Sequence, residues 1–347
     1  MDTEEKIKNT VAKILGSANS LPHTHKALLE MREIQASSDI TFGVLEERNT
    51  PGIEETPLSW VDSEKDLHQM CCSLENERVI AVDLEHSQDC SYFGKICLVQ
   101  ISTVERDYVV DALKLEGCLH GLNKVTASPR ILKIFHGATT DVGWLHTAGV
   151  FVTNIFDTYE AAVFLGLDKR SLEYLLMRYE NISKDKACTR EDWTRRPLTD
   201  RMLSYARIDT RYLIGIHAKM ARLLMQEENN IRKLVLLCSL KETVCFKVDS
   251  VERRKAMWRQ HMSLARKRNP TLGVCEETYL KLHTLREEIA SREDICCLTI
   301  IQNSPLYRLA AGPLSITSLE KFFSEKRDCY RLPFMKTLGL ASKETPQ

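Results

Sequence analysis

Acidic residues recur at three places in this chain, at spacings that suit the binding of divalent metal ions. Asp83 and Glu85 stand in AVDLEH, at the end of an apolar run that predicts a buried strand. Residues i and i+2 of a strand point to the same face, so both carboxylates should project together. Two carboxylates this close repel each other unless a cation lies between them. The pair therefore predicts a cation site at the end of this strand.

Two later segments supply candidate partners for that pair. Asp141, in FHGATTDVGWL, follows another apolar run and is expected in the first turns of a helix. Taken alone, an acid at that position is explained by its favourable interaction with the helix dipole. Tyr205 and Asp209 stand in LSYARIDTRYL at a spacing of i, i+4, which puts both on one helical face. Apolar positions flank this face, so we expect Asp209 to point toward the sheet.

The order of these acids along the chain is more specific than any one of them. Oxygen ligands without histidine or cysteine suit Mg²⁺ or Mn²⁺. Two such ions, about 4 Å apart, can bind the attacking water and the leaving 3′ oxygen of an in-line phosphoryl displacement. We therefore expect a two-metal active site in which Asp83, Glu85, Asp141 and Asp209 bind the ions and Tyr205 is the fifth catalytic residue.

The elements that would position these residues are predicted by apolar periodicity. Strands are expected over residues 78–85, 95–103, 106–113 and 131–137, with a short strand leading into a helix over 152–159. Helices are expected from Trp60 to Leu74 (capped near Asp62 or Ser63), over 138–149, over 171–179, and as one long helix from Asp200 to Met225. Strands that first cluster and then alternate with helices imply an α/β fold with a mixed sheet.

The length of 347 residues suits two compact domains. Prolines punctuate a series of short helical patterns in the last third of the chain, including YLKLHTLREEIASRED, LTIIQNSPLYRLA and SLEKFF, so this part should be all-helical. We predict an N-terminal arm over 1–57, an α/β domain that carries the acidic residues over 58–225, a helical linker over 226–270 and a small helical domain over 271–337.

Composition excludes several other classes of protein. Hydrophobic residues make up 43% and charged residues 28%, which is ordinary for a globular protein, and no uninterrupted apolar run is long enough to predict a membrane span. The 12 cysteines are scattered without zinc-type spacing, which favours reduced thiols in the cytosol or nucleus. The net charge of zero disfavours a protein that simply coats nucleic acid, but it is compatible with an enzyme whose metals neutralise phosphate.

The sequence resembles a known family, the DEDD 3′-5′ exonucleases of the tyrosine subclass, also called RNase D-like. Within it, the resemblance is strongest to the branch that accompanies the nuclear RNA exosome. The motifs that carry the resemblance span about residues 58–220 and are VDLEH, YFGKICLVQIST, RDYVVDALKL, KIFHGATTDVGWL, IFDTYEAA, GLDKRSLEYLL, EDWTRRPL and MLSYARIDTRYL.

The resemblance implies a ribonuclease H-like fold and hydrolysis of RNA from its 3′ end to nucleoside 5′-monophosphates. Carried over by motif, Asp83, Glu85, Asp141 and Asp209 would bind two Mg²⁺ or Mn²⁺ ions, and Tyr205 would orient the attacking water. Tyrosine is a weak base at neutral pH, so positioning and metal activation of water should carry the chemistry.

The resemblance also implies partners and a location. The residues YLKLHTLREEIASREDI resemble the opening of an HRDC domain, the small helical module that follows the nuclease domain in this family. The expected partners are single-stranded RNA, the exosome core, and a small helical cofactor protein bound through the N-terminal region, with no membrane. The expected location is the nucleus, including the nucleolus, with some cytoplasmic presence, and the expected role is processing of ribosomal and other RNA.

Four further residues are candidates for binding substrate. His136 could contact a phosphate or support the nearby acid, or it could be a satisfied buried histidine. Trp144 stands about one helical turn after Asp141 and could stack on a terminal base, whereas core packing is the alternative. Trp193 and Arg195 stand in EDWTRRPL, in a loop before the Tyr205 helix, where arginine could hold the RNA backbone. Arginine in this loop could instead pair with acids beside it in sequence.

Two other functions remain compatible with the sequence. The same chemistry could act on DNA, because discrimination depends on contacts to the 2′-hydroxyl that sequence does not locate. A catalytically silent RNA-binding scaffold is the alternative from another class. Failure to bind Mn²⁺ would favour the scaffold, and a comparison of matched RNA and DNA oligomers would separate the two nuclease hypotheses.

Overall fold

The computed structural model describes residues 50–89, 91–184, 191–225, 234–235, 238, 255–311 and 328–337. The predictions for most of the N-terminal arm, for much of the helical linker and for a helix over SLEKFF lie outside these residues. The chain divides into two compact units, which are described separately. The first comprises Met1–His86 and Ile96–Lys247, and the second comprises Ser87–Lys95 and Val248–Gln347.

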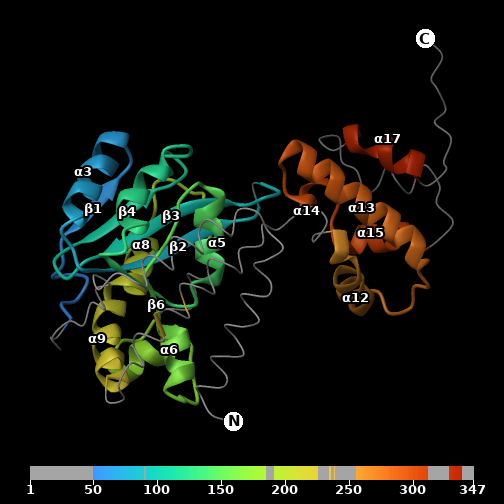
Figure 1. The fold of residues 1–347 in the computed structure, drawn as a ribbon. Coiled ribbons are helices and arrows are strands. Elements are labelled where there is room, and N and C mark those ends of the chain that lie inside the picture. The colour runs from blue at the N-terminus through green and yellow to red at the C-terminus, as the bar shows by residue number, and fades with distance from the viewer. Residues whose placement is uncertain are drawn as a thin grey trace. The chain divides into compact units, whose positions relative to one another are not determined.

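The first unit is built around a six-stranded sheet with the strand order β1-β4-β3-β2-β5-β6 (Figure 1). Strand β1 is parallel to β4, β2 is parallel to β5, and β5 is parallel to β6, whereas β3 and β4 are antiparallel. The mixed sheet and α/β class expected from the sequence are confirmed. The strands are β1 Leu58–Val61, β2 Val79–Ser87, β3 Lys95–Ser102, β4 Asp107–Asp111, β5 Leu132–Phe135 and β6 Ile155–Asp157.

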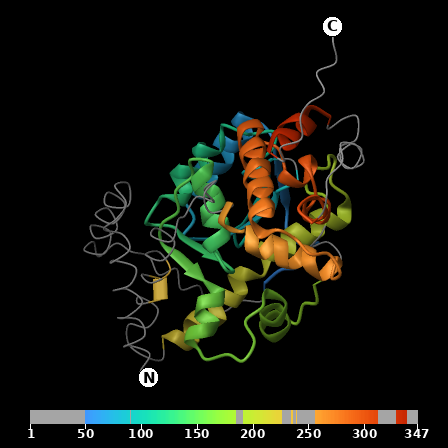
Figure 2. The ribbon, with the colours of Figure 1, turned by 90° about the vertical axis from the view of Figure 1, so that its right-hand side faces the viewer.

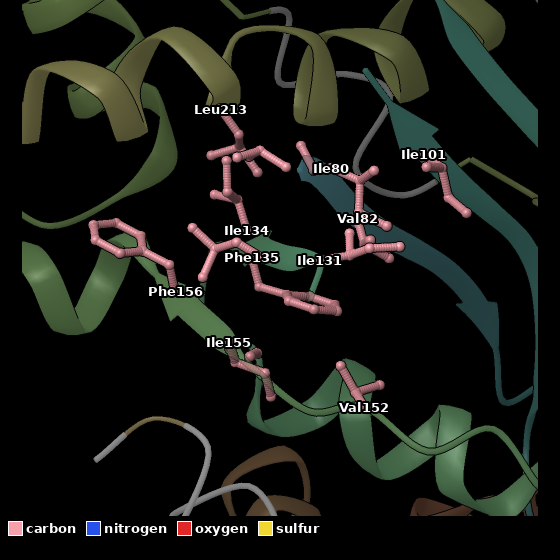
Figure 3. Close-up of a cluster of buried hydrophobic side chains, with 14 of the residues drawn as sticks. Ile80, Val82, Ile101, Ile131, Ile134, Phe135, Val152, Ile155, Phe156 and Leu213 are labelled. Carbon is pink, nitrogen blue, oxygen red and sulfur yellow. The ribbon is translucent and has the colours of Figure 1, made fainter. Parts of the chain in front are cut away.

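Helices pack on this sheet and enclose an apolar core. Ile80 of β2, Ile134 and Phe135 of β5, and Leu213 converge there and are almost completely buried (Figure 3). The helical elements of the unit are α3 Glu64–Leu74, η1 Leu119–Leu122, α4 Asn123–Thr126, α5 Thr139–Thr147, α6 Thr158–Phe164, α7 Leu172–Leu175, η2 Leu176–Glu180, α8 Asp200–Arg211 and α9 Leu213–Leu224. None of the described helices is long and apolar enough to cross a membrane.

The structure shows that two of the helix predictions are wrong in their extent. The helix expected from Trp60 begins only at Glu64, where Ser63 caps it by accepting a hydrogen bond from the Asp66 amide at 3.2 Å. The residues before it form β1, because backbone pairing with β4 outweighs their local helical pattern. The single long helix expected from Asp200 is two helices, α8 and α9, which meet at Tyr212.

The described elements between residues 258 and 337 are all helices (orange to red in Figures 1 and 2). They form the second unit together with residues 87–95. Asp294, at the C-terminal end of α13, accepts hydrogen bonds from Ser91 Oγ at 2.7 Å and the Tyr92 amide at 3.1 Å. The Tyr92 side chain is completely buried in the core of this unit. The helices are α12 Trp258–Arg268, α13 Glu276–Glu293, α14 Cys297–Ile300, α15 Asn303–Leu309 and α17 Asp328–Thr337.

Candidate active site

The acidic pair of strand β2 lies on the less buried face of the strand. Asp83 and Glu85 are half-buried, while Leu84 between them is 6% exposed and belongs to the core. The alternation follows from the two-residue period of a strand. Both carboxylates therefore project from the same face, as the spacing predicts.

Helix α8 contributes two residues of the predicted site, Tyr205 and Asp209. Its N-cap is Thr199, whose hydroxyl accepts a hydrogen bond from the Met202 amide. Tyr205 and Asp209 are 7% and 4% exposed, so the shared helical face is directed inward. One oxygen of Asp209 lies within 4.8 Å of an oxygen from each of Asp83 and Glu85. The pair and the helix thus place three carboxylates in one cluster.

The electrostatics of the cluster show how closely these charges approach. Burial and the neighbouring carboxylates raise the pKa of Asp83 well above its usual range. Burial and the charge of Asp209 raise the pKa of Glu85 to about 8. The charge of Asp141 also raises the pKa of both groups, so it acts on the cluster, but Asp141 is not among the three acids whose oxygens lie within 4.8 Å of one another. Carboxylates in such a cluster are destabilised in their charged form, and a divalent cation would remove that cost.

The turn before Asp141 is fixed by Asp157, an acid outside the predicted metal-binding set. Asp141 stands in the first turn of α5, after a turn in which Gly137 adopts a positive φ of 75°. Asp157, at the end of β6, accepts hydrogen bonds from the amides of Gly137 at 2.8 Å and Ala138 at 3.0 Å. It also caps α6 by accepting from the Tyr159 amide at 2.8 Å. One buried carboxylate thereby ties the turn before Asp141 to the neighbouring strand.

Lys184 is a second residue that the sequence did not single out. Its Nζ lies 2.5 Å from Oδ1 and 2.6 Å from Oδ2 of Asp209, and 4.1 Å from the centre of the Tyr205 ring. Burial lowers the pKa of Lys184, but the charge of Asp209 and the hydrogen bonds to Asp209 and Tyr205 together outweigh this and raise it overall. The ammonium group partly offsets the negative charge of the cluster. No spacing signal could have identified it, because the contact joins a loop to a helix distant in sequence.

His136 lies next to the cluster as a neutral imidazole. Its Nδ1 is 2.9 Å from the Thr158 hydroxyl, which in turn donates to the Phe135 carbonyl at 3.1 Å. That hydroxyl can therefore only accept from the ring, which assigns the proton to Nδ1 and leaves the Nε2 lone pair available. Burial, followed by the charge of Lys184, lowers the pKa of His136 to about 4.

The other three substrate candidates differ in their surroundings. Trp144 is partly buried against the core, and its ring is tilted by 48° relative to His86, with the ring centres 4.7 Å apart. Trp193 is only 4% exposed and packs in a small core cluster with Tyr205, at 6.0 Å between ring centres. Arg195 is exposed.

The guanidinium group of the neighbouring Arg196 is engaged by other protein groups. It grips Asp111 through Nε and Nη2, both at 2.7 Å, and Nη2 also donates to the Cys97 carbonyl. The alternative that arginine here pairs with an acid therefore holds for Arg196, although the acid lies on β4 and not beside it in sequence. This ion pair anchors the loop that precedes α8.

The residues of the cluster fit a hard divalent cation. The donors from Asp83, Glu85 and Asp209 are all carboxylate oxygens, which are the ligands that Mg²⁺ and Mn²⁺ prefer. Burial and the mutual repulsion of the carboxylates raise the pKa of Asp83 and Glu85, and the charge of Lys184 does not reverse this. The charge of Asp141 adds to this repulsion. The cluster can therefore hold a divalent metal ion.

The segment that carries these acids matches a known protein family. Residues 58–225 match the family described as 3′-5′ exonuclease. This segment belongs to the 3′-5′ exonuclease family. The matched segment contains all five residues that sequence analysis assigned to the site, and it has the same bounds as the predicted nuclease domain.

The relatives of this exonuclease domain include proteins of the exosome. The chain is 40% identical over 206 residues to the exosome complex exonuclease RRP6 of Saccharomyces cerevisiae, covering 59% of this chain and 28% of that protein. It is 36% identical over 264 residues to exosome complex component 10 of Homo sapiens, covering 74% of this chain and 29% of that protein. The chain thus spans less than a third of the length of these two relatives.

Solved structures agree with the assignment of the fold. The catalytic core of RRP6 from Trypanosoma brucei matches with a TM-score of 0.75 at 28% identity, over 89% of this chain and 86% of that one. The exoribonuclease RNase D of Escherichia coli matches with a TM-score of 0.58 at 20% identity, over 84% of this chain and 78% of that one. The ribonuclease H-like exonuclease fold expected from the resemblance is confirmed.

Proposed function

We propose that this protein is a 3′-5′ exoribonuclease that hydrolyses single-stranded RNA to nucleoside 5′-monophosphates with two divalent metal ions, Mg²⁺ or Mn²⁺. The observation that carries the proposal is the convergence of Asp83, Glu85 and Asp209 within 4.8 Å, inside a segment of the 3′-5′ exonuclease family. The charge of Asp141 supports the proposal, since it raises the pKa of both acids of β2.

In this mechanism Asp83, Glu85, Asp141 and Asp209 hold the metal ions. When bound, the ions would supply an activated water and stabilise the leaving 3′ oxygen. Tyr205 orients the water by hydrogen bonding, as its position one turn from Asp209 on the buried face of α8 allows. The largely buried setting strengthens these polar interactions because little solvent screens them.

The surrounding residues would guide the substrate. His136 offers a neutral Nε2, which can accept a hydrogen bond from a ribose hydroxyl. Trp144, a partly buried residue of α5, is suited to stack on the terminal base. Arg195 is exposed and could pair with a backbone phosphate. The burial of Trp193 against Tyr205 favours a role in positioning the tyrosine over a direct contact with RNA.

The test is cleavage of a 5′-labelled single-stranded RNA with and without Mg²⁺ or Mn²⁺. We expect stepwise shortening from the 3′ end that requires metal and releases nucleoside 5′-monophosphates. Asp83→Asn and Asp209→Asn should each abolish shortening while leaving the circular dichroism spectrum unchanged. Asp168→Asn, which alters an exposed acid of the same unit, is the matched control and should remain fully active. Full activity in either site variant would refute the site.

We choose RNA over DNA as the proposed substrate because of the names that the relatives carry. The yeast relative is named an exosome exonuclease, and the solved Escherichia coli protein is named an exoribonuclease. A matched pair of RNA and DNA oligomers of one sequence tests the choice. Faster shortening of the DNA oligomer would overturn it in favour of the DNA exonuclease hypothesis.

The same relatives support a setting for the activity. We place the protein in nuclear RNA processing and degradation with the exosome, because the yeast and human relatives carry the exosome in their names. The helical region over 271–337 would be the HRDC-like module. A small helical partner would bind through the N-terminal region, whose first 49 residues lie outside the described part of the chain. Co-purification of tagged protein with exosome core subunits from nuclear extract tests this setting.

A further inference from the structure

A second cluster of metal-ligating side chains lies in the helical unit. His261 of α12 faces His283 of α13, with His261 Nδ1 and His283 Nε2 only 2.9 Å apart. Glu287 follows one helical turn after His283, and its Oε1 is 3.7 Å from His283 Nε2. One ligand atom from each of these three side chains lies within 4.8 Å of the others. The cluster shares no residue with the carboxylate site.

His261 presents the lone pair of Nδ1 toward the centre of the cluster, where this nitrogen faces His283 Nε2 at 2.9 Å. Arg286 Nη2, which is always a donor, lies 3.5 Å from His261 Nδ1, so that nitrogen must carry its lone pair and not a proton.

The carboxylate of the cluster is fixed in orientation. Arg286 donates to Glu287 Oε1 through Nε at 3.2 Å and through Nη2 at 2.9 Å. A hydrogen-bonding partner of this kind is what a metal-ligating carboxylate usually has. Arg286 also donates through Nη1 to the Ile301 carbonyl and to Asn303 Oδ1, so its charge is spread over other acceptors.

We propose that His261, His283 and Glu287 bind one transition-metal ion, with Zn²⁺ as the best fit, and that this ion joins α12 to α13. Two imidazoles and one carboxylate are a common three-ligand set for zinc, with a water in the fourth position. Imidazole donors select Zn²⁺ over Mg²⁺, which separates this site chemically from the carboxylate cluster. His283 and Glu287 are 0% and 1% exposed, whereas His261 is partly exposed, so an ion could enter from its side.

The alternative is a hydrogen-bonded network without metal. In that state His283 Nε2–H donates to His261 Nδ1, and Glu287 serves only Arg286. Both states are compatible with the contacts made by Arg286, so the two are distinguished by whether the purified protein binds zinc at these residues.

The experiment uses the full chain carrying Asp83→Asn and Asp209→Asn, which removes metal binding by the carboxylate cluster. After purification with added Zn²⁺ and gel filtration, elemental analysis should find about one equivalent of zinc. Replacement by Co²⁺ should give the visible absorption of a tetrahedral or five-coordinate ion. His261→Gln and His283→Gln, each added to this background, should lose the zinc and the absorption.

Two further variants keep the test decisive. Glu288→Gln changes the adjacent exposed acid, which pairs with Lys255 at 2.8 Å, and it should retain the zinc. His261→Cys replaces one zinc ligand with another and should also retain it. Because His261 is only partly buried, its substitution by glutamine should leave the helical circular dichroism intact even if the change at His283 does not. Absence of zinc from the background protein, or equal zinc in His261→Gln, would overturn the proposal.

Discussion

Asp209 experiences two opposing influences. Burial raises its pKa to about 6 and so favours protonation, whereas contact with Lys184 Nζ favours the ionised form. The ammonium group lies against both carboxylate oxygens, and these are the oxygens that a metal ion at the site would use. Lys184 therefore both stabilises the charge of Asp209 and competes with metal for it.

Removal of this competition should strengthen metal binding. We expect Lys184→Met, which keeps a long apolar stem, to lower the Kd for Mn²⁺ on the order of tenfold, equivalent to about 1.4 kcal/mol. Lys184→Arg retains the charge and should bind Mn²⁺ as the unaltered protein does. Titration calorimetry of the two variants checks this. An unchanged Kd in the methionine variant would mean that Lys184 moves away from Asp209 at no cost.

At the scale of elements, the turn between β5 and α5 depends on a neighbouring strand. Asp157 accepts three amide hydrogen bonds, two from the turn that precedes Asp141 and one from the first turn of α6. An asparagine there would keep the size of the side chain but present an NH₂ group to at least one of these donors. The position of Asp141 relative to β2 would then be less well fixed.

Asp157→Asn should therefore weaken metal binding, although the side chain at this position is not a proposed metal ligand. We expect Mn²⁺ affinity and RNA shortening to fall by about 10- to 100-fold, as is typical when a residue that positions a metal ligand is changed. Asp168→Asn again serves as the control. Calorimetry gives the affinity independently of activity. If affinity were preserved while activity fell, Asp157 would be acting on the substrate and not on Asp141.

Helix α9 carries a buried histidine with an effect on stability. His217 is 0% exposed, neither ring nitrogen has a hydrogen-bond partner, and it packs edge-on against Phe156 at 4.6 Å. Burial lowers its pKa to about 3. The unfolded chain takes up a proton on this residue near pH 6.5, but the folded chain does not until the pH is far lower.

The free energy of unfolding should consequently fall as the pH drops below about 6.5. Above that value the histidine is neutral in both states and contributes no pH dependence. His217→Leu fills a similar space without a titrating group, so its stability should fall less steeply between about pH 6.5 and 4.5. Urea denaturation at a series of pH values measures the difference. Parallel curves for the two proteins would show that another group dominates this range.

At the scale of the whole molecule, metal binding should be linked to folding. The carboxylates of the cluster come from β2 and α8, which are distant in sequence and meet only in the folded chain. An ion that binds the folded state alone stabilises it, by about 2.7 kcal/mol at a concentration one hundred times its Kd. Mn²⁺ should therefore raise the Tm of the protein, and a chelator should reverse the change.

The variant with Asp83→Asn and Asp209→Asn provides the comparison. Its Tm should not respond to Mn²⁺, whereas Asp168→Asn should respond as the unaltered protein does. Differential scanning fluorimetry in the same buffer checks both. An equal rise in Tm in all three proteins would place the stabilising ion elsewhere in the chain.

Local periodicity determined a large part of this protein from sequence alone. The i, i+2 spacing of Asp83 and Glu85 and the i, i+4 spacing of Tyr205 and Asp209 depend only on the geometry of a strand and a helix. Once each segment adopts its element, each pair must share a face. Apolar runs located five of the six strands, β2 to β6, and the mixed sheet followed from their order.

Contacts between distant segments were decided only by the tertiary structure. The local sequence pattern of residues 60–61 predicts a helix, but these residues pair with β4. The helical periodicity of α8 continues into α9, so it does not reveal the break at Tyr212. The ammonium of Lys184 against Asp209 and the clamp of Asp157 on the turn after β5 have no sequence spacing of their own. Their partners are chosen by which surfaces the fold brings together, because packing and charge act through space and not along the chain.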